Sequence, residues 1–252
     1  MGEVVVVGGE KGGTGKTTVA VNIAIMSAIQ GKDTLYVDAD NQGSGKKFFE
    51  RRNENNDLTQ LTSVGILGKH LNQEINRLAA KYDRIIIDCG GLDSVELRSA
   101  LVSEAASIWV SPLQPTDFDL DTLTTLDELA EISSTYNPKL KAKILFNKCH
   151  THSKIKTVDE AKEIVTDNFP HLSPLETSLG HRVVFQYSIS NNQSVVEFEK
   201  KEYDKLPPYQ AKKYPSKGGE EITSLYNNIF VDQFKPLIQP PANSEKKEEE
   251  CV

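Results

Sequence analysis

Short apolar runs alternate along the first 170 residues with segments in which apolar residues recur every three or four positions. A continuous apolar run bounded by turn residues is typical of a strand buried on both faces of a parallel sheet, and the longer period is typical of a helix. The pattern predicts strands over residues 3–8, 34–37, 61–67, 84–89, 107–110 and 142–147. It predicts helices over residues 16–30, 46–52, 69–80, 94–105, 121–134, 157–169 and 219–234.

Strands that alternate with helices form βαβ units, which assemble into a parallel sheet covered by helices on both faces. We therefore predict one α/β domain over residues 1–236, built on a mostly parallel, twisted sheet. The segment 237–252 contains a proline pair and the charged run 245–250, so it predicts a disordered acidic tail.

Composition narrows the functional classes. The chain has 252 residues, of which 36 are acidic and 29 basic, so its formal net charge is -7 and contact with nucleic acid requires a local basic patch. Apolar runs such as 4–7 are far shorter than the roughly 20 residues of a membrane span, so we expect none. Cys89, Cys149 and Cys251 form no C-x-x-C motif, and we predict Cys89 and Cys149 to be buried or half-buried thiols of a cytoplasmic protein.

The strongest chemical signal is a glycine-rich stretch between the first predicted strand and helix. It reads Lys11-Gly12-Gly13-Thr14-Gly15-Lys16-Thr17-Thr18. Glycines let backbone N–H groups close around phosphate oxygens, and the helix N-terminus adds a partial positive charge. Lys16 can reach the terminal phosphates, and the Thr17 hydroxyl can bind Mg²⁺. The stretch from Gly12 to Thr18 therefore predicts a site for ATP and Mg²⁺.

The strict form of this motif has glycine where this chain has Glu10, and here Lys11 directly precedes the glycine pair. In this deviant form the sequence resembles the ParA/MinD family of P-loop ATPases. The resemblance implies a homodimer with ATP held between the subunits, in which Lys11 reaches across to the partner's nucleotide. It also implies catalytic roles for Lys11 and Lys16.

Two acidic motifs extend the resemblance. The stretch Asp38-Ala39-Asp40-Asn41-Gln42 resembles the family's switch motif, with Asn41 in place of the usual proline. We predict that Asp40 orients the attacking water and binds the metal, with Asp38 as a supporting group. Asp88 ends a buried apolar run at the edge where open α/β sheets bind ligands, and it resembles the Walker B carboxylate that holds the Mg²⁺ water shell.

Weaker similarity continues toward the C-terminus. The segment 112–118 resembles the loop after the fifth strand of small partition ATPases. Asn147 occupies the position at which relatives have an asparagine that contacts adenine, so the resemblance implies that role. The alternative is that Asn147 only stabilises a local turn. The segment from Arg182 to Val195 loosely resembles the stretch before the family's final helices.

Other features distinguish the branches of the family. The first predicted strand begins at residue 3, so we expect no N-terminal helix-turn-helix domain, and the chain resembles small ParA proteins of the ParF type and MipZ-type pole organisers. Its acidic end lacks the basic amphipathic helix of MinD, which disfavours membrane binding. The positions of Cys89 and Cys149 disfavour an iron–sulfur protein, and the internal positions of the tyrosines disfavour a tyrosine kinase.

The segment 199–218 resembles the family poorly and forms a basic insertion. Within residues 200–217, six lysines and two acidic residues give a local charge of +4. Lysines interleaved with tyrosines suit sequence-independent contact with DNA phosphates, so we predict that Lys200, Lys201, Lys212 and Lys213 bind DNA. The alternative is a solvated surface without a ligand.

The sequence thus predicts a cytoplasmic, nucleoid-associated ATPase that dimerises on ATP, binds DNA and positions plasmid, chromosomal or other cargo. The resemblance implies that a ParB-like or other cargo adaptor stimulates its weak hydrolysis. The alternatives are an ATP-dependent polar scaffold of the MipZ or TadZ type and, less favoured, a MinD-like membrane-cycling regulator.

Overall fold

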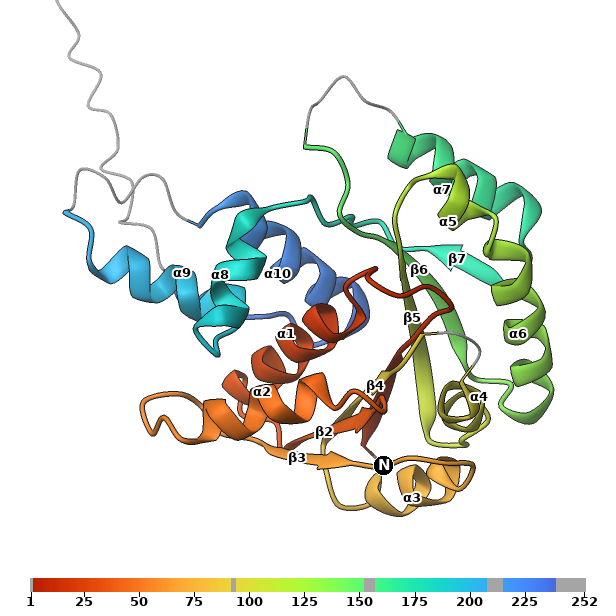
Figure 1. Ribbon diagram of the computed structural model, residues 1–252, viewed down its shortest axis with the longest axis horizontal. Coiled ribbons are helices and arrows are strands. Elements are labelled where there is room, and N and C mark those ends of the chain that lie inside the picture. Colours follow the sequence, from red (N-terminus) through yellow and green to blue (C-terminus); the bar gives the residue numbers. More distant parts are fainter. Residues whose placement is uncertain (1, 92–93, 152–156, 208–214, 239–252) are drawn as a thin grey trace, which may run out of the picture.

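The computed structural model describes residues 2–91, 94–151, 157–207 and 215–238. A seven-stranded sheet runs through the middle, in the order β3-β2-β4-β1-β5-β6-β7, and every neighbouring pair is parallel (Figure 1). The strands are β1 (Glu3–Val7), β2 (Thr34–Ala39), β3 (Thr62–Gly65), β4 (Arg84–Cys89), β5 (Ala106–Leu113), β6 (Lys141–Phe146) and β7 (Leu172–Pro174). The predicted α/β domain with a parallel sheet is confirmed.

Helices cover both faces of the sheet (Figure 1). One face carries α3 (Leu71–Leu78), α4 (Val95–Leu101), α6 (Leu123–Tyr136) and α7 (Thr157–Asn168), with the short α5 (Asp117–Leu120) before α6. The other carries α1 (Lys16–Ile29), α2 (Ser44–Asn53), α8 (Val183–Ser190), α9 (Val195–Asp204) and α10 (Lys217–Ile229). Each face buries its own apolar cluster, because strands such as β1 alternate their side chains between the two faces.

Some elements differ from the sequence prediction. The pattern does not predict β7, which is three residues long, nor α5 or α8. It also does not predict α9, a mostly polar helix that starts with a capping box between Ser194 and Glu197. The last helix ends at Ile229 rather than at residue 234, because Phe230 adopts an extended conformation.

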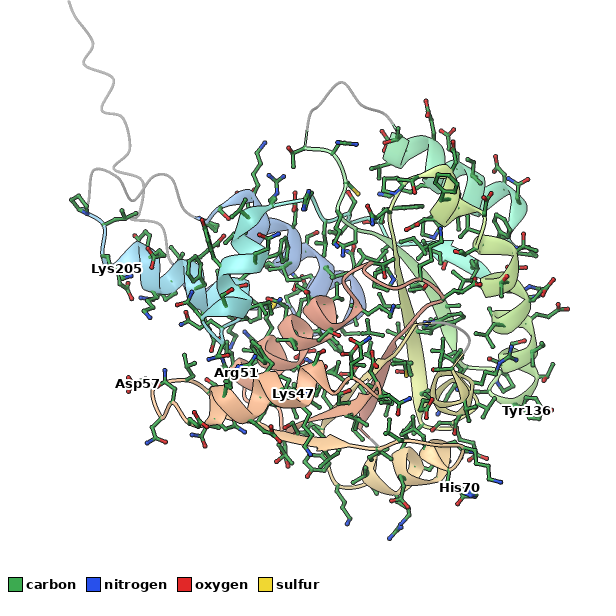
Figure 2. All side chains as sticks on the ribbon, viewed as in Figure 1. Lys47, Arg51, Asp57, His70, Tyr136 and Lys205 are labelled. Carbon is green, nitrogen blue, oxygen red and sulfur yellow. The ribbon has the colours of Figure 1, made fainter. Side chains whose placement is uncertain are left out.

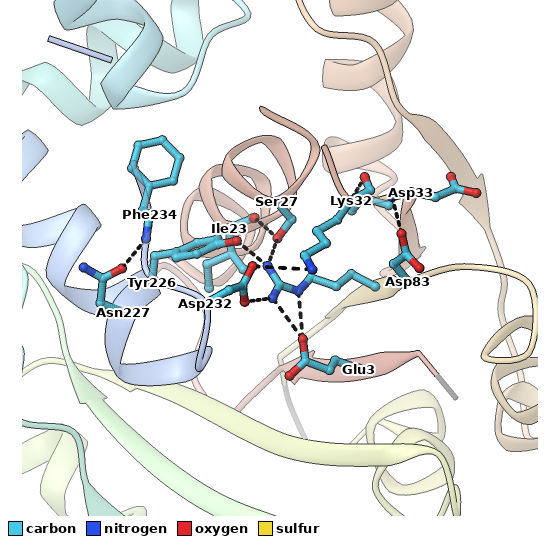
Figure 3. A network of polar contacts seen from close by, with 12 residues as sticks. Glu3, Ile23, Ser27, Lys32, Asp33, Asp83, Tyr226, Asn227, Asp232 and Phe234 are labelled. Carbon is cyan, nitrogen blue, oxygen red and sulfur yellow. Dashed lines mark hydrogen bonds and ion pairs between the residues drawn. The ribbon is translucent and has the colours of Figure 1, made fainter. Parts of the chain in front are cut away.

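A buried arginine explains where the last helix ends. Arg84, at the amino end of β4, donates hydrogen bonds to Glu3, Tyr226 and Asp232 (Figure 3). Its guanidinium lies 3.6 Å from the centre of the Phe230 ring. These contacts hold the segment after α10 against the amino ends of the strands. The phosphate loop lies at the opposite edge of the sheet, at the carboxyl ends of the strands.

The predicted tail lies largely outside the described residues. Of residues 237–252, the structure describes Leu237, which packs against the apolar cluster of its face, and Ile238, which is buried. The predicted burial of Cys89 and Cys149 is confirmed, and Cys251 lies outside the described residues.

Candidate active site

The glycine-rich loop joins β1 to α1 at the carboxyl edge of the sheet. Gly13 (φ 77°) and Gly15 (φ 94°) take left-handed conformations that favour glycine. A Cβ on Gly15 would come within 2.4 Å of the Asn147 amide nitrogen, whereas the space around Gly12 and Gly13 is open. Gly15 caps α1 without a side chain, so the first N–H groups of the helix remain available to an anion.

Lys16 is a nearly buried cation at this loop. Its side chain donates to the backbone carbonyl of Lys11, a neutral group. Burial lowers the pKa of Lys16, while the charges of Asp88 and Asp40 raise it. The Thr14 hydroxyl, also buried, has no hydrogen-bond partner among the described residues. Among the described residues Lys16 makes no ion pair and the Thr14 hydroxyl has no partner, which fits a loop that receives a phosphate group.

Asp88 lies at the end of β4 and is buried. It accepts a hydrogen bond of 2.8 Å from the Tyr36 hydroxyl and another from Thr17. Burial raises the pKa of Asp88 to about 7; the bonds from Thr17 and Tyr36 lower it, and the charges of Asp38 and Asp40 raise it further. Tyr36 itself has a pKa raised well above its usual value, because it is buried next to this carboxylate.

Asp38 and Asp40 lie at the end of β2. Asp38 is buried and accepts hydrogen bonds from the backbone N–H groups of Asp40 (3.0 Å) and Lys46 (2.7 Å), which fixes the start of α2. Asp40 lies beside Gly90 and lines a cavity of about 200 Å³ with Gly12 and Gly91. The structure therefore brings the predicted residues Lys16, Asp40 and Asp88 to one place.

The oxygen atoms at this place suit magnesium. Thr17, Asp40 and Asp88 offer hydroxyl and carboxylate oxygens, the ligands that Mg²⁺ prefers. Among the described residues no group of three or more His, Cys, Asp or Glu side chains could hold a metal by itself. Mg²⁺ would therefore take its remaining ligands from nucleotide phosphates and water, as it does in other nucleotide sites.

A second cavity, of about 370 Å³, adjoins the start of α1. Asn147 lines it, and its side chain also donates 2.7 Å to the Thr14 carbonyl. The apolar part of the wall comes from Val19, Leu179, Phe185 and Ile189. A cavity of this size with an apolar wall suits a nucleotide base. Leu179, Phe185 and Ile189 come from segments that no motif marks. The weak similarity over 182–195 covers Phe185 and Ile189, and no signal in the sequence points to Leu179.

Lys11 is held by its own chain. Its ammonium contacts the Phe118 carbonyl, lies 3.2 Å from the Asp119 carboxylate and sits 5.8 Å from the centre of the Phe118 ring. The predicted contact of Lys11 with a partner's nucleotide thus requires that Lys11 leave Asp119.

The predicted DNA-binding lysines are only partly described. Lys200 forms an ion pair of 2.6 Å with Asp204 within α9. Lys205, which directly follows α9 (Figure 2), forms an ion pair with Glu202. Lys201 is exposed. Lys212 and Lys213 lie outside the described residues.

Comparison with known proteins agrees with this geometry. Residues 5–202 match the model of the family described as CobQ/CobB/MinD/ParA nucleotide binding domain. The chain belongs to this family. The predicted ParA/MinD resemblance is confirmed, and since members of the ParA/MinD family are ATPases, the chain carries a nucleotide-binding domain of that kind.

The names of individual relatives indicate different cargoes. The chain is 27% identical over 190 residues to maintenance of carboxysome distribution protein A of Halothiobacillus neapolitanus, covering 74% of this chain and 83% of the relative. It shares its fold with an ATP complex of Cyanothece McdA (TM-score 0.67, 13% identity, 94% and 99% coverage). It also shares it with a plasmid partition protein of Borrelia burgdorferi bound to AMPPNP (TM-score 0.61, 17% identity, 91% and 97% coverage).

The buried carboxylate gives a pH-dependent expectation. The folded pKa of Asp88, about 7, lies above the unfolded value of roughly 4, so the folded chain binds more protons between these values and its stability falls as pH rises from 4 to 7. We expect Asp88→Asn to raise the free energy of unfolding of the ligand-free protein by up to a few kcal/mol at pH 8 and to change it little near pH 4. Urea titrations at both pH values measure this, and an equal effect at both would contradict it.

Proposed function

We propose that the chain is a ParA-type ATPase that dimerises on ATP, binds DNA without sequence preference and positions a cargo through an adaptor that stimulates hydrolysis. The observation that carries the proposal is the set of charges around one phosphate loop: an almost buried Lys16 that makes no ion pair among the described residues, with the charges of Asp40 and Asp88 close enough to raise its pKa. The relatives' names support a cargo such as a plasmid or a large protein assembly.

Nucleotide binding follows from the loop. The backbone N–H groups from Gly12 to Thr18 surround the phosphates, and Lys16 exchanges the Lys11 carbonyl for phosphate oxygens. Thr17 and Asp88 would hold Mg²⁺, with Asp40 reaching it through water, and the ion would neutralise charge on the phosphates. Asn147 and the apolar wall of the larger cavity receive the adenine.

Hydrolysis requires an oriented water. Asp40 lines the small cavity beside Gly12, and its place is fixed because Asp38 accepts the Asp40 backbone N–H. A carboxylate held there orients the attacking water and accepts its proton. Lys11 of one subunit covers the partner's terminal phosphate, and since the isolated chain holds Lys11 on Asp119, hydrolysis is slow until the dimer is aligned.

In this proposal, ATP binding and hydrolysis control whether the protein is bound to DNA. No described helix is long and apolar enough to cross a membrane. We propose that the ATP-bound dimer binds the nucleoid through Lys200, Lys201, Lys212 and Lys213, and that ADP releases it. Because Lys200 is partly neutralised by Asp204, one subunit offers few free charges, and dimerisation, which doubles them, controls the affinity.

The test is DNA binding in the presence of ATP and of ADP. We expect the wild-type protein to shift unrelated duplexes with ATP and only weakly with ADP, with a log–log salt slope of about -0.9 per phosphate contacted. Changing the four lysines to Glu should abolish the shift and preserve ATP-driven dimerisation. The matched control changes Lys69, Lys81, Lys139 and Lys141, exposed lysines elsewhere, to Glu and should still bind. Equal binding with ADP, binding that survives the change of the four lysines, or an equal loss of binding in the control would contradict the proposal.

A further inference from the structure

Lys148 stands beside the phosphate loop but belongs to no motif of the sequence. It directly follows Asn147 at the end of β6 and lines the larger cavity together with Gly15 and Thr18. Its ammonium lies 2.5 Å from the Gly13 carbonyl oxygen, to which it donates. A residue far along the chain therefore places a positive charge on the glycine loop, on a different carbonyl from the one that Lys16 contacts.

The backbone of Lys148 is in an unfavourable conformation. Its φ of 54° is one of two positive values among the described residues other than glycine, and the second belongs to Asn192. Lysine adopts this region rarely, whereas glycine and asparagine adopt it readily. A long cationic side chain at such a position is consistent with a role that glycine or asparagine could not perform.

Hydrogen bonds on both sides hold this conformation in place. The backbone N–H of Asn147 donates to Leu113 (2.7 Å), that of Cys149 to Leu179 (2.9 Å), and that of Lys148 to the Asn147 side chain (2.8 Å). The lysine side chain is exposed on the cavity side, and within the described residues it has no carboxylate in ion-pair distance. The fold thus places at the edge of the phosphate loop an ammonium that makes no ion pair with any residue that the structure describes.

We infer that Lys148 is a further nucleotide-binding residue: its ammonium spans the Gly13 carbonyl and the phosphates of the bound nucleotide. An ammonium has three hydrogens, so one bond to Gly13 leaves donors for phosphate oxygens. The inference rests on the nucleotide site proposed above. It adds to that site a second phosphate-binding lysine, from the same subunit as Lys16. It requires no contribution from a second subunit, so it applies to ADP and ATP alike.

The test is calorimetric titration with ADP and Mg²⁺ of the wild-type protein, Lys148→Asn and Lys148→Arg. Asparagine accepts the positive φ but lacks the charge, and arginine keeps the charge. We expect Lys148→Asn to bind ADP about 10-fold or more weakly at low salt, with a melting temperature unchanged or higher without nucleotide. Lys148→Arg should recover most of the affinity. The matched control is Lys139→Asn, an exposed lysine near the opposite end of β6, which should bind as wild type.

Salt dependence separates phosphate contact from bracing of the loop alone. If Lys148 contacts phosphate, the difference between wild type and Lys148→Asn shrinks as salt rises, because ions screen the attraction. Equal affinity of the two proteins, or a loss that is the same at low and high salt, would overturn the inference. Failure of the wild-type protein to bind ADP would instead overturn the nucleotide site itself.

Discussion

Lys16→Ala is expected to abolish nucleotide binding, with an affinity at least about 100-fold below that of the wild type. Lys16 is the almost buried cation of the phosphate loop, and its ammonium now rests on a neutral carbonyl. Without it, the loop's N–H groups must hold several phosphate charges alone, and hydrogen bonds between charged groups are the strong ones. Calorimetry with ATP and Mg²⁺ measures the loss.

The control for this variant is Lys47→Ala, which removes an exposed lysine on α2 (Figure 2). We expect it to bind ATP as the wild type does. Lys16→Ala should remain folded in thermal unfolding, because burial already disfavours the charge of Lys16, as its lowered pKa indicates. If Lys16→Ala binds ATP with unchanged affinity, the assignment of the phosphate loop is wrong.

Asp40→Ala is expected to lower steady-state hydrolysis about 100-fold or more and to leave ATP binding nearly intact. Asp40 lines the small cavity beside the loop, and the Lys16 ammonium donates to the Lys11 carbonyl, so the loop keeps its cation when Asp40 is removed. Removing a group that orients water and takes its proton typically costs two to four orders of magnitude. Phosphate release from ATP, with adaptor or DNA added where the wild type needs them, measures the rate.

The matched control is Asp57→Ala, an exposed carboxylate just beyond α2 (Figure 2). It should hydrolyse ATP at the wild-type rate. Hydrolysis by Asp40→Ala at the wild-type rate would assign the orientation of water to another residue. A loss of ATP binding by Asp40→Ala would instead show that Asp40 acts through the structure of the loop.

The central sheet can be predicted from the sequence because its strands are buried on both faces. The apolar run 84–89 coincides with β4, and the run at 3–8 matches β1 within one residue. The elements that the pattern misses derive their stability from other causes. β7 adds three residues to an existing edge, and α9 is fixed by its capping box and by Arg52, a buried arginine of α2 that contacts Glu197.

Some residues of the candidate site can likewise be predicted from the sequence, and others cannot. Lys16, Thr17 and the glycines are close together in the sequence, so a motif reveals them. Asp40 follows one predicted strand, and Asp88 lies near the end of another. Lys148 and the apolar wall of the cavity beside Asn147 come together only through the topology of the sheet, which local sequence patterns do not predict. The pairing of Lys11 with Asp119 likewise joins residues more than 100 positions apart.

The molar mass of Asp40→Ala with ATP tests the central claim most directly, because this variant should bind ATP without consuming it. Light scattering on the eluting protein should give about twice the chain mass of 28.0 kDa with ATP and Mg²⁺, and the mass of one chain with ADP. Adding Lys11→Ala to this variant should return the ATP form to one chain. A single-chain mass for Asp40→Ala with both nucleotides, at a concentration where ATP is bound, would contradict an ATP-driven dimer.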